Sequence, residues 1–221
     1  MKKIVIAIDG PASSGKSTVA DAVADKLNIL HLNTGSLYRS IALFCLNNNI
    51  SFNDETSIKN NLNKCDIQIR FENGIQQDYL NNKLVTHFLR TDDISKGSSV
   101  VSQFKCVRQK VLNLQRDIAD KLSVVMEGRD ITSEVLPNAD YKFFITASAE
   151  ERAKRRYKEN LSMGLSCDYQ TILDEIKERD YRDYNRKISP LKIVDDAFVI
   201  DTTDMTIEQV VEKVLKKIKI N

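Results

Sequence analysis

The hydrophobic positions of this chain fall into short continuous runs, separated by longer stretches in which an apolar residue recurs every three or four positions. Continuous runs of this kind are typical of strands that are buried on both faces of a parallel sheet. Recurrence at Val19, Val23 and Leu27 is typical of a helix with one apolar face. The pattern predicts an α/β fold with a five-stranded parallel sheet flanked by helices. The runs that predict strands are residues 4–9, 29–32, 123–126, 141–145 and 197–200.

A different pattern covers residues 63–97. Residues 65–71 alternate between apolar and polar positions, Asn73-Gly74 is a strong hairpin-turn signal, and two short strand-like runs follow it. These runs are residues 75–80 and 83–85. We expect a small antiparallel sheet inserted between helices, which either carries a substrate-facing flap or is a surface excursion.

Helical patterns cover three further stretches of the chain. Residues 40–46 predict a helix after the second strand, and residues 94–120 predict a mostly helical segment with one apolar face. Thr206 is expected to cap a last amphipathic helix that has lysines near its end. Residues 47–63 are polar and rich in asparagine, and no element is predicted there.

The arginines are concentrated in one part of the chain: seven of the twelve lie between Arg129 and Arg186. Two sets among them have helical spacing, so each set lies on one face of a helix. Met163-Gly164 can turn the chain between the sets and produce a helical hairpin. A charge run is usually a solvated face, but guanidinium groups match phosphate oxygens in pairs, which favours phosphate binding. The sets are Arg152, Arg155 and Arg156, and Arg179, Arg182 and Arg186.

The composition is that of an ordinary globular protein. The chain has 221 residues, of which 42% are hydrophobic and 29% charged, and its net charge of +2 gives no general case for nucleic-acid binding. No apolar run approaches a membrane span, and no signal-peptide pattern is present. Four dispersed cysteines with only two histidines argue against a zinc site and fit reduced thiols. We expect a cytoplasmic monomer without nucleic-acid or membrane partners.

A glycine-rich loop joins the first predicted strand to the first predicted helix. It fits the pattern G-x-x-x-x-G-K-[ST], in which successive N–H groups and a helix N-terminus surround phosphates. Lys16 would reach the β- and γ-phosphates of a nucleoside triphosphate, and the Ser17 hydroxyl would bind Mg²⁺. A loop that only turns the chain is the alternative. The residues of the loop are Gly10, Pro11, Ala12, Ser13, Ser14, Gly15, Lys16, Ser17 and Thr18.

Polar side chains follow two further predicted strands. Thr34, Tyr38 and Arg39 lie after the second strand, and residues 127–130, Glu-Gly-Arg-Asp, come directly after the third. Ligands of doubly wound sheets bind beyond the carboxyl ends of the strands. Charged groups near a core are costly without a partner, so we expect these residues to meet a second substrate. Arg108 lies close to the apolar face of its helix, where its head can reach the same pocket.

The triphosphate site alone allows a phosphotransferase, a nucleotide-gated switch or a binding module without chemistry. An alcohol acceptor requires a carboxylate base, whereas a phosphate acceptor is already an anion and requires cations that hold two polyanions together. The many arginines can hold two polyanions together, as a phosphate acceptor requires. The N-K-x-D pattern of guanine-binding switches does not occur in the sequence. The sequence therefore favours phosphoryl transfer to a phosphate.

These motifs resemble those of bacterial cytidylate kinases, in the same order along essentially the whole chain. The antiparallel insertion also occurs where that family has its acceptor-domain insert. The resemblance implies a P-loop NTPase-type fold and the Mg²⁺-dependent reaction of ATP with CMP or dCMP. It further implies a core of residues 1–62, 98–150 and 188–221, an acceptor-binding insertion at 63–97 and a lid at 151–187. The matching motifs are residues 10–18, 34–39, 107–108, 127–130, 178–186, 201–203 and 207–210.

The resemblance implies a role for each matching residue. Catalytic roles would fall to Lys16, Arg129, Asp130 and Arg179. The cytosine would be surrounded by Ser99, Arg108, Asp130 and Arg186, and the ribose would meet Arg179 and Asp183. The acceptor phosphate would bind Arg39 and Arg129, with Arg179, Thr34 and Tyr38 nearby. The donor would bind the glycine-rich loop with Arg152, Arg155 and Arg156.

Cytosine offers a 4-amino donor and two acceptors, which suits a carboxylate beside cationic donors. Uracil places a carbonyl beside Asp130, so we expect cytosine to be preferred. The chain departs from the family pattern at Asn33, Lys105 and Thr132, where Asp, Pro and Gly are usual. The alternatives are a kinase of another nucleoside monophosphate such as UMP, and a non-catalytic nucleotide-binding module.

Overall fold

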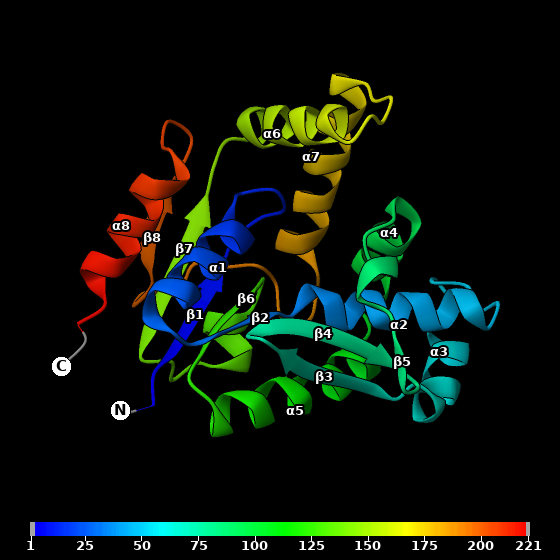
Figure 1. Ribbon diagram of the computed structural model, residues 1–221. Helices are drawn as coiled ribbons and strands as arrows, with labels where there is room; N and C mark the ends of the chain where they lie inside the picture. Colours follow the sequence, from blue (N-terminus) through cyan, green and yellow to red (C-terminus); the bar gives the residue numbers. More distant parts are fainter. Residues whose placement is uncertain (1–2, 220–221) are drawn as a thin grey trace.

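A five-stranded parallel sheet forms the centre of the structure, a computed structural model that describes residues 3–219 (Figure 1). The strand order is β2-β6-β1-β7-β8, and every neighbouring pair is parallel. The predicted parallel sheet is therefore confirmed. Residues 1 and 221, the outer limits of the predicted core, lie outside the described residues. The strands are β1 (Val5–Asp9), β2 (Leu30–Asn33), β6 (Val124–Gly128), β7 (Tyr141–Thr146) and β8 (Phe198–Asp201).

Eight α-helices accompany the strands within residues 3–219. None of the helices in this range combines the length and apolar character that crossing a membrane requires. The helices are α1 (Lys16–Leu27), α2 (Gly35–Asn47), α3 (Glu55–Asn61), α4 (Asp92–Val101), α5 (Lys105–Lys121), α6 (Ala149–Ser162), α7 (Tyr169–Asn185) and α8 (Ile207–Lys217). Short helical turns are η1 (Leu62–Lys64), η2 (Thr86–Phe88) and η3 (Ile131–Val135).

Helices cover both faces of the parallel sheet because successive side chains of a strand point to opposite faces. Ile6 and Ile8 of β1 belong to a core cluster with α1 and α8. Val5 and Ala7 belong to a second cluster, which includes residues of α5 and η3 on the other face. The residues of both clusters are buried, so the sheet is a rigid support for the loops at its carboxyl edge.

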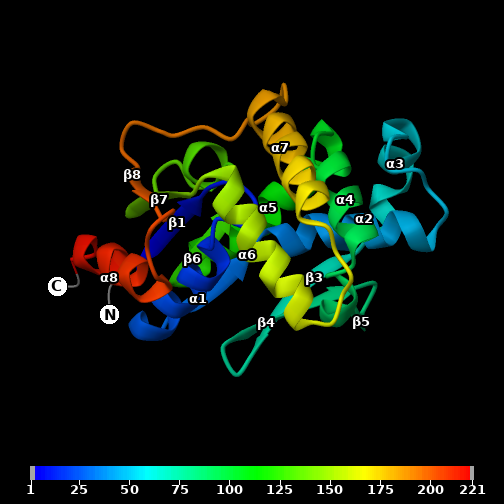
Figure 2. The same ribbon diagram turned by 90° about the horizontal axis from the view of Figure 1, so that it is seen from above.

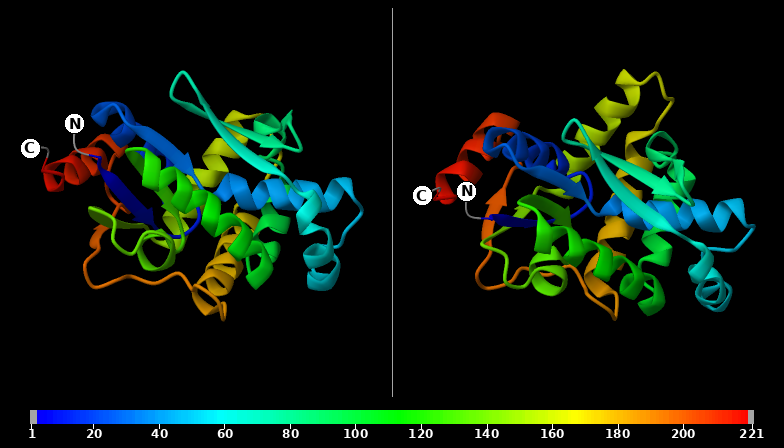
Figure 3. Two further views of the ribbon diagram at one scale, coloured as in Figure 1. Left: turned by 90° about the horizontal axis from the view of Figure 1, so that it is seen from below. Right: turned by 60° about the horizontal axis from the view of Figure 1, so that its bottom comes forward.

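The small antiparallel sheet is confirmed, with the order β3-β4-β5. Asn73 and Gly74 both have positive φ, as a two-residue hairpin turn requires. The sheet packs against α2 and α5 through a third core cluster, and Figure 3 shows the small sheet lying across α2. Its strands are β3 (Ile67–Glu72), β4 (Ile75–Leu80) and β5 (Lys83–Leu84).

Three helical segments differ from the expected pattern. Helix α2 begins five residues earlier than residue 40, and α3 forms in the polar stretch where none is predicted, with Asp54 as its N-cap. Residues 94–120 are not one segment, because α4 ends before Phe104, whose backbone is extended. Phe104 still packs into the α2–α5 core, so the apolar spacing continues across the break.

The two arginine-bearing segments form a helical hairpin, as predicted. Helices α6 and α7 are joined by a turn at Met163 and Gly164, where Gly164 has a φ of +73°. Ala153 of α6 packs against Ile172 and Ile176 of α7. The hairpin lies above the carboxyl edge of the parallel sheet, with α7 beside α4 (Figure 2).

Candidate active site

The glycine-rich loop connects β1 to α1 in the order that the sequence predicts. A Cβ atom at Gly10 would overlap the carbonyl oxygen of Ile145, so only glycine fits there. Gly15 precedes α1 with a φ of +85° and supplies no side-chain cap. The first N–H groups of α1 therefore remain available, and together with the helix dipole they favour an anion.

Lys16 is buried at the start of α1. Its Nζ donates to the carbonyl oxygen of Pro11 (3.2 Å) and lies 3.8 Å from Oε2 of Glu127. Burial, followed by repulsion from Arg129, lowers the pKa of Lys16 to about 7. The negative charge around Lys16 is therefore too small to stabilise its charged form fully, and a bound phosphate would supply more.

Four cations from four elements lie close together at the carboxyl edge of the sheet. They are Lys16 of α1, Arg39 of α2, Arg129 after β6 and Arg179 of α7. Burial, followed by the charge of Arg129, lowers the pKa of Arg39. The same two causes, with a further contribution from Arg39, lower the pKa of Arg179 to about 9. The structure therefore brings together the cations that the sequence predicts around two phosphates.

A second cluster lies between α5, α7 and the end of β6. Arg108 forms an ion pair with Oδ2 of Asp130, and Arg186 approaches Oδ1 of the same carboxylate at 3.7 Å. The guanidinium of Arg108 lies 5.6 Å from the centre of the Tyr38 ring. Burial raises the pKa of Tyr38 to about 12, so this hydroxyl is protonated at neutral pH. The cluster therefore consists of one carboxylate, two guanidiniums and a phenol. These groups could hydrogen-bond to a small polar ring.

Residues of α7 connect this cluster to the four cations. Asp183 is buried and accepts a 2.9 Å hydrogen bond from Nε of Arg129. Arg182 of the same helix donates from Nη1 to Oγ of Ser99 (3.2 Å).

Thr34 lies directly after β2. It donates from its hydroxyl to the carbonyl oxygen of Glu127 (2.7 Å), which ties the end of β2 to β6.

The three arginines of α6 do not lie together over the loop. Arg152 donates to the carbonyl oxygen of Ala12 (3.1 Å) and pairs with Asp180 of α7. Arg155 donates to the carbonyl oxygen of Thr202 (2.6 Å). Arg156 instead faces Asp92 at the start of α4, at 3.3 Å. Of the three, Arg152 donates a hydrogen bond to the glycine-rich loop, and Nη1 of Arg155 lies 3.8 Å from the Cβ position of Gly15.

Asp9 is a site residue that the sequence patterns did not single out. It is fully buried and accepts hydrogen bonds from the backbone of Ile131 (2.9 Å) and Thr132 (2.7 Å), and from the Thr132 hydroxyl (2.6 Å). The carboxylate thereby fixes the turn that carries Arg129 and Asp130. Thr132, one of the departures from the family pattern, therefore adds a hydrogen bond to this corner. The only sequence signal is an acid at the end of a buried strand.

His31 is a second group that sequence reasoning missed. Its Nδ1 lies 3.2 Å from Oδ1 of Asp21, and its Nε2 lies 3.8 Å from Oε1 of the buried Glu127. Glu127 also faces Lys16, and despite its burial these neighbours lower its pKa to about 2. Glu127 is therefore a fixed negative charge behind the glycine-rich loop.

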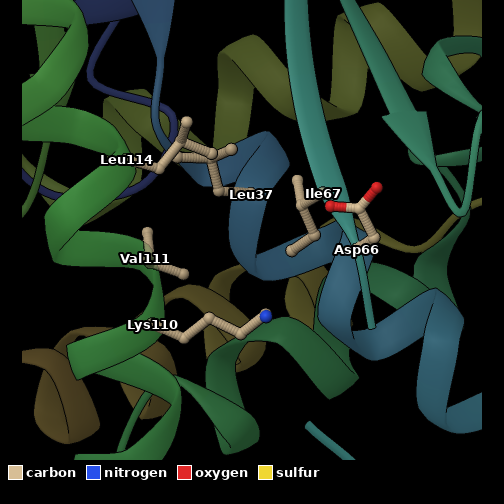
Figure 4. A pocket seen from close by; sticks show the side chains of 6 residues that line it. All are labelled: Leu37, Asp66, Ile67, Lys110, Val111 and Leu114. Carbon is tan, nitrogen blue, oxygen red and sulfur yellow. The ribbon is translucent and has the colours of Figure 1, made fainter. Parts of the chain in front are cut away.

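A cavity of about 90 Å³ lies away from these clusters, between α2, α5 and the start of β3 (Figure 4). Ligand pockets for drug-sized molecules usually measure about 300 to 1,000 Å³, so this cavity is too small for a nucleotide. Figure 4 shows mostly aliphatic walls, with Lys110 and Asp66 as the charged members. The lining residues are Leu37, Asp66, Ile67, Lys110, Val111 and Leu114.

Comparisons with known proteins show the family of the chain. The family model described as cytidylate kinase matches residues 6–220. A cytidylate kinase of Caldicellulosiruptor saccharolyticus is 48% identical over 98% of this chain and 96% of its own length. Those of Leuconostoc mesenteroides and Bacillus subtilis are 45% and 42% identical, covering 100% and 99% of this chain and 99% and 97% of their own lengths.

A solved structure of an uncharacterized protein from Eubacterium ventriosum resembles the fold, with a TM-score of 0.53, 16% identity and 97% coverage of both chains. At this identity the likeness concerns the fold alone. The family match and the relatives extend over the loop, both polar clusters and the hairpin described above. The chain is therefore a phosphotransferase that belongs to the cytidylate kinase family.

Proposed function

We propose that the enzyme transfers the γ-phosphoryl group of ATP to the phosphate of CMP or dCMP and releases ADP with CDP or dCDP. The observation that carries this proposal is the convergence of Lys16, Arg39, Arg129 and Arg179 at one edge of the sheet. Mutually repelling cations that are withdrawn from water favour a further anion beside the carboxylates of Glu127 and Asp183. Two nucleotides that meet end to end would supply that anion.

On the acceptor side, Arg39, Arg129 and Arg179 would bind the phosphate of CMP, with Thr34 and Tyr38 alongside. The buried cluster of Arg108, Asp130 and Arg186, with Ser99 next to it, would read the cytosine. Asp183 and Arg179 would contact the ribose. Support comes from the close packing of these side chains in the structure and from the Ser99–Arg182 and Asp183–Arg129 contacts.

On the donor side, residues 10–18 would surround the triphosphate, and Lys16 would contact its β- and γ-phosphates. Arg152, Arg155 and Arg156 would complete the site after exchanging their protein oxygens for phosphate oxygens. The Ser17 hydroxyl would hold Mg²⁺ together with the phosphates, since hydroxyl and phosphate oxygens are the ligands that this hard cation prefers. When bound, Mg²⁺ would neutralise charge that develops between the phosphates.

The acceptor phosphate is already an anion, so the protein does not need to remove a proton from it. The work of the side chains is to align the two phosphates and to offset their repulsion. Arg129 has a partner to release during this step, because Asp183 holds its Nε in the present state. The exchange of a carboxylate for a phosphate keeps the guanidinium paired throughout.

We further propose that the chain divides into a core of residues 1–62, 98–150 and 188–221, an acceptor-binding insertion at 63–97 and a lid at 151–187. The insertion forms a sheet of its own and the hairpin has a core cluster of its own, and both observations support this division. We also propose a cytoplasmic monomer without nucleic-acid or membrane partners. The small net charge and the unpaired thiols of Cys45 and Cys65 support this assignment.

A coupled assay of ADP release with CMP, dCMP, UMP and AMP tests the proposal. We expect turnover with CMP and dCMP, and a loss of at least about a hundredfold with every acceptor in Lys16→Ala. ADP release with none of the four acceptors contradicts the proposal. Full activity of Lys16→Ala contradicts the role given to the loop.

A further inference from the structure

Through the side chain of Gln76, strand β4 of the insertion reaches the end of β2, directly before α2, the helix that carries Arg39. The backbone N–H of Asn33 donates to Oε1 of Gln76 (2.8 Å), and Nε2 of Gln76 approaches the carbonyl oxygen of Asn33 at 3.4 Å. The amide of Gln76 therefore accepts from the backbone of the last residue of β2 and lies beside the carbonyl group of the same residue. The contact holds the exit of β2 at the point where the chain turns into α2.

Asp78 continues this contact on the same face of β4. Only 3% of its surface is exposed, and its Oδ1 accepts from Oγ of Ser36 (2.5 Å) and from Nε2 of Gln76 (2.8 Å). Nε2 of Gln76 also donates to Oγ of Ser36 (2.7 Å), which closes a triangle of hydrogen bonds. A buried network with its members satisfied is rigid, because each group would be left unpaired by a movement of the others.

Ser36 lies in the first turn of α2, one turn before Arg39. The guanidinium of Arg39 folds back over this turn, since its Nη1 would lie 3.6 Å from a Cβ atom at Gly35. Asp78 and Arg39 are close enough that the carboxylate raises the pKa of Arg39 and the guanidinium lowers the pKa of Asp78, although burial is the larger influence on both. The triangle thus lies beside the arginine assigned to the acceptor phosphate.

We propose that Gln76 and Asp78 are positioning residues that hold Arg39 in place for the acceptor phosphate. The inference rests on the proposed function, in which Arg39 binds that phosphate. It gives the antiparallel insertion a specific role, because β4 fixes the first turn of α2 and α2 presents the guanidinium. The effect is confined to the phosphate end of the acceptor, because neither side chain contacts Arg108, Asp130 or Arg186.

Steady-state kinetics of Gln76→Ala and Asp78→Asn test this inference, with Gln68→Ala as the matched control. Gln68 has the same side chain in the same sheet, but within residues 3–219 its bonds are to Asp66, Asn82 and Arg70 on the exposed side. We expect the KM for CMP to rise about tenfold in the two variants while the KM for ATP stays within about twofold. Gln68→Ala should leave both constants unchanged.

A second measurement separates positioning from a general loss of structure. Cytidine lacks the phosphate, so its inhibition constant should stay within about twofold in Gln76→Ala although CMP binding weakens. In an Arg39→Ala background, Gln76→Ala should add less than about twofold, because the group it positions is absent. Equal weakening of cytidine and CMP, or a full additional effect in the Arg39→Ala background, overturns the inference.

Failure of the inference and failure of the proposed function give different results. If Arg39→Ala weakens CMP binding and Gln76→Ala does not, the positioning role is wrong and the proposed function stands. If Arg39→Ala leaves CMP binding unchanged, the phosphate-binding role of Arg39 is wrong. Thermal melts identify variants that do not fold, and Ser36→Ala, which removes one member of the same triangle, then replaces Asp78→Asn with the same expected result.

Discussion

Nε of Arg129 donates a 2.9 Å hydrogen bond to Oδ2 of Asp183, which joins the end of β6 to α7. The Arg108–Asp130 and Arg152–Asp180 pairs have the same character: each places a buried or half-buried guanidinium on a carboxylate of the protein. Internal carboxylates therefore hold arginines that the proposed mechanism assigns to phosphates and to the base. This pairing allows so many cations to be brought together before a nucleotide arrives.

Asp183→Ala should destabilise the free enzyme, because Arg129 would keep its charge in a largely buried position without its partner. A loss of about 3 kcal/mol in the free energy of unfolding is expected from the removal of one member of a buried pair. Urea unfolding measures this loss. Saturating CMP should recover part of it in the variant, since the phosphate would replace the carboxylate. An unchanged unfolding midpoint would contradict the interpretation of this ion pair.

Asp130→Ala should reduce the preference for CMP over UMP. The proposed hydrogen bond from the 4-amino group of cytosine to this carboxylate is lost, and so is the repulsion of the uracil carbonyl. The ratio of kcat/KM for the two acceptors should fall by about tenfold or more. This ratio is independent of the fraction of folded enzyme, so a loss of stability caused by breaking the Arg108 ion pair does not affect it. An unchanged ratio would refute the assignment.

Gly10→Ala should destabilise the fold by about 3 kcal/mol or more, because the new methyl group would overlap the backbone of Ile145. Gly74→Ala is the matched control. Gly74 also has a positive φ, of +80°, but no atom lies within 4 Å of its Cβ position. Gly74→Ala should lower the free energy of unfolding by only about 1 kcal/mol, the cost of a side chain at positive φ. Equal losses in the two variants, measured by thermal unfolding, would exclude the steric explanation.

Asp9 should make stability depend on pH in the acidic range. Burial raises its pKa from 3.8 to about 6, so the folded protein binds this proton more tightly than the unfolded chain. Its contribution to stability is complete below about pH 4 and is lost as the pH rises through 6. Between these limits, the free energy of unfolding of the wild type minus that of Asp9→Asn should fall by about 3 kcal/mol.

Urea unfolding at several pH values between 4 and 7 measures the Asp9 effect. Asp9→Asn also loses acceptor capacity toward Thr132, which lowers stability by an amount that does not depend on pH. The test is therefore how the difference in the free energy of unfolding between wild type and Asp9→Asn changes with pH, and not how large that difference is. A difference that is constant with pH would show that Asp9 ionises normally in the folded protein.

The strands, the antiparallel insertion and the arginine hairpin could be predicted from the sequence because each has a local signal. Apolar runs mark the strands, and Asn73-Gly74 marks a turn whose φ angles are positive. Helix α3 has no such signal, since Ile58 is its only buried residue. The break before Phe104 was missed because the apolar spacing continues through it.

The partners of the arginines could not be predicted, because ion pairs are formed between residues that are distant in sequence. Arg152 and Asp180 are 28 positions apart, and Arg129 and Asp183 are 54 apart. Spacing on a helix indicates which arginines share a face, but a partner on another element is fixed only by the tertiary packing. Arg156 illustrates the limit: it shares a face with Arg152, yet it contacts α4 instead of the loop.

One hairpin carries side chains for both nucleotides: Arg152 contacts the loop that would bind the donor, and Asp183 and Arg186 lie in the clusters that would bind the acceptor. Because α6 and α7 pack as one unit, a shift that improves contact with one ligand also changes the reach of side chains to the other. Heterotropic coupling follows, and thermodynamic linkage makes it reciprocal. Whatever factor ATP contributes to the affinity for CMP, CMP must contribute to the affinity for ATP.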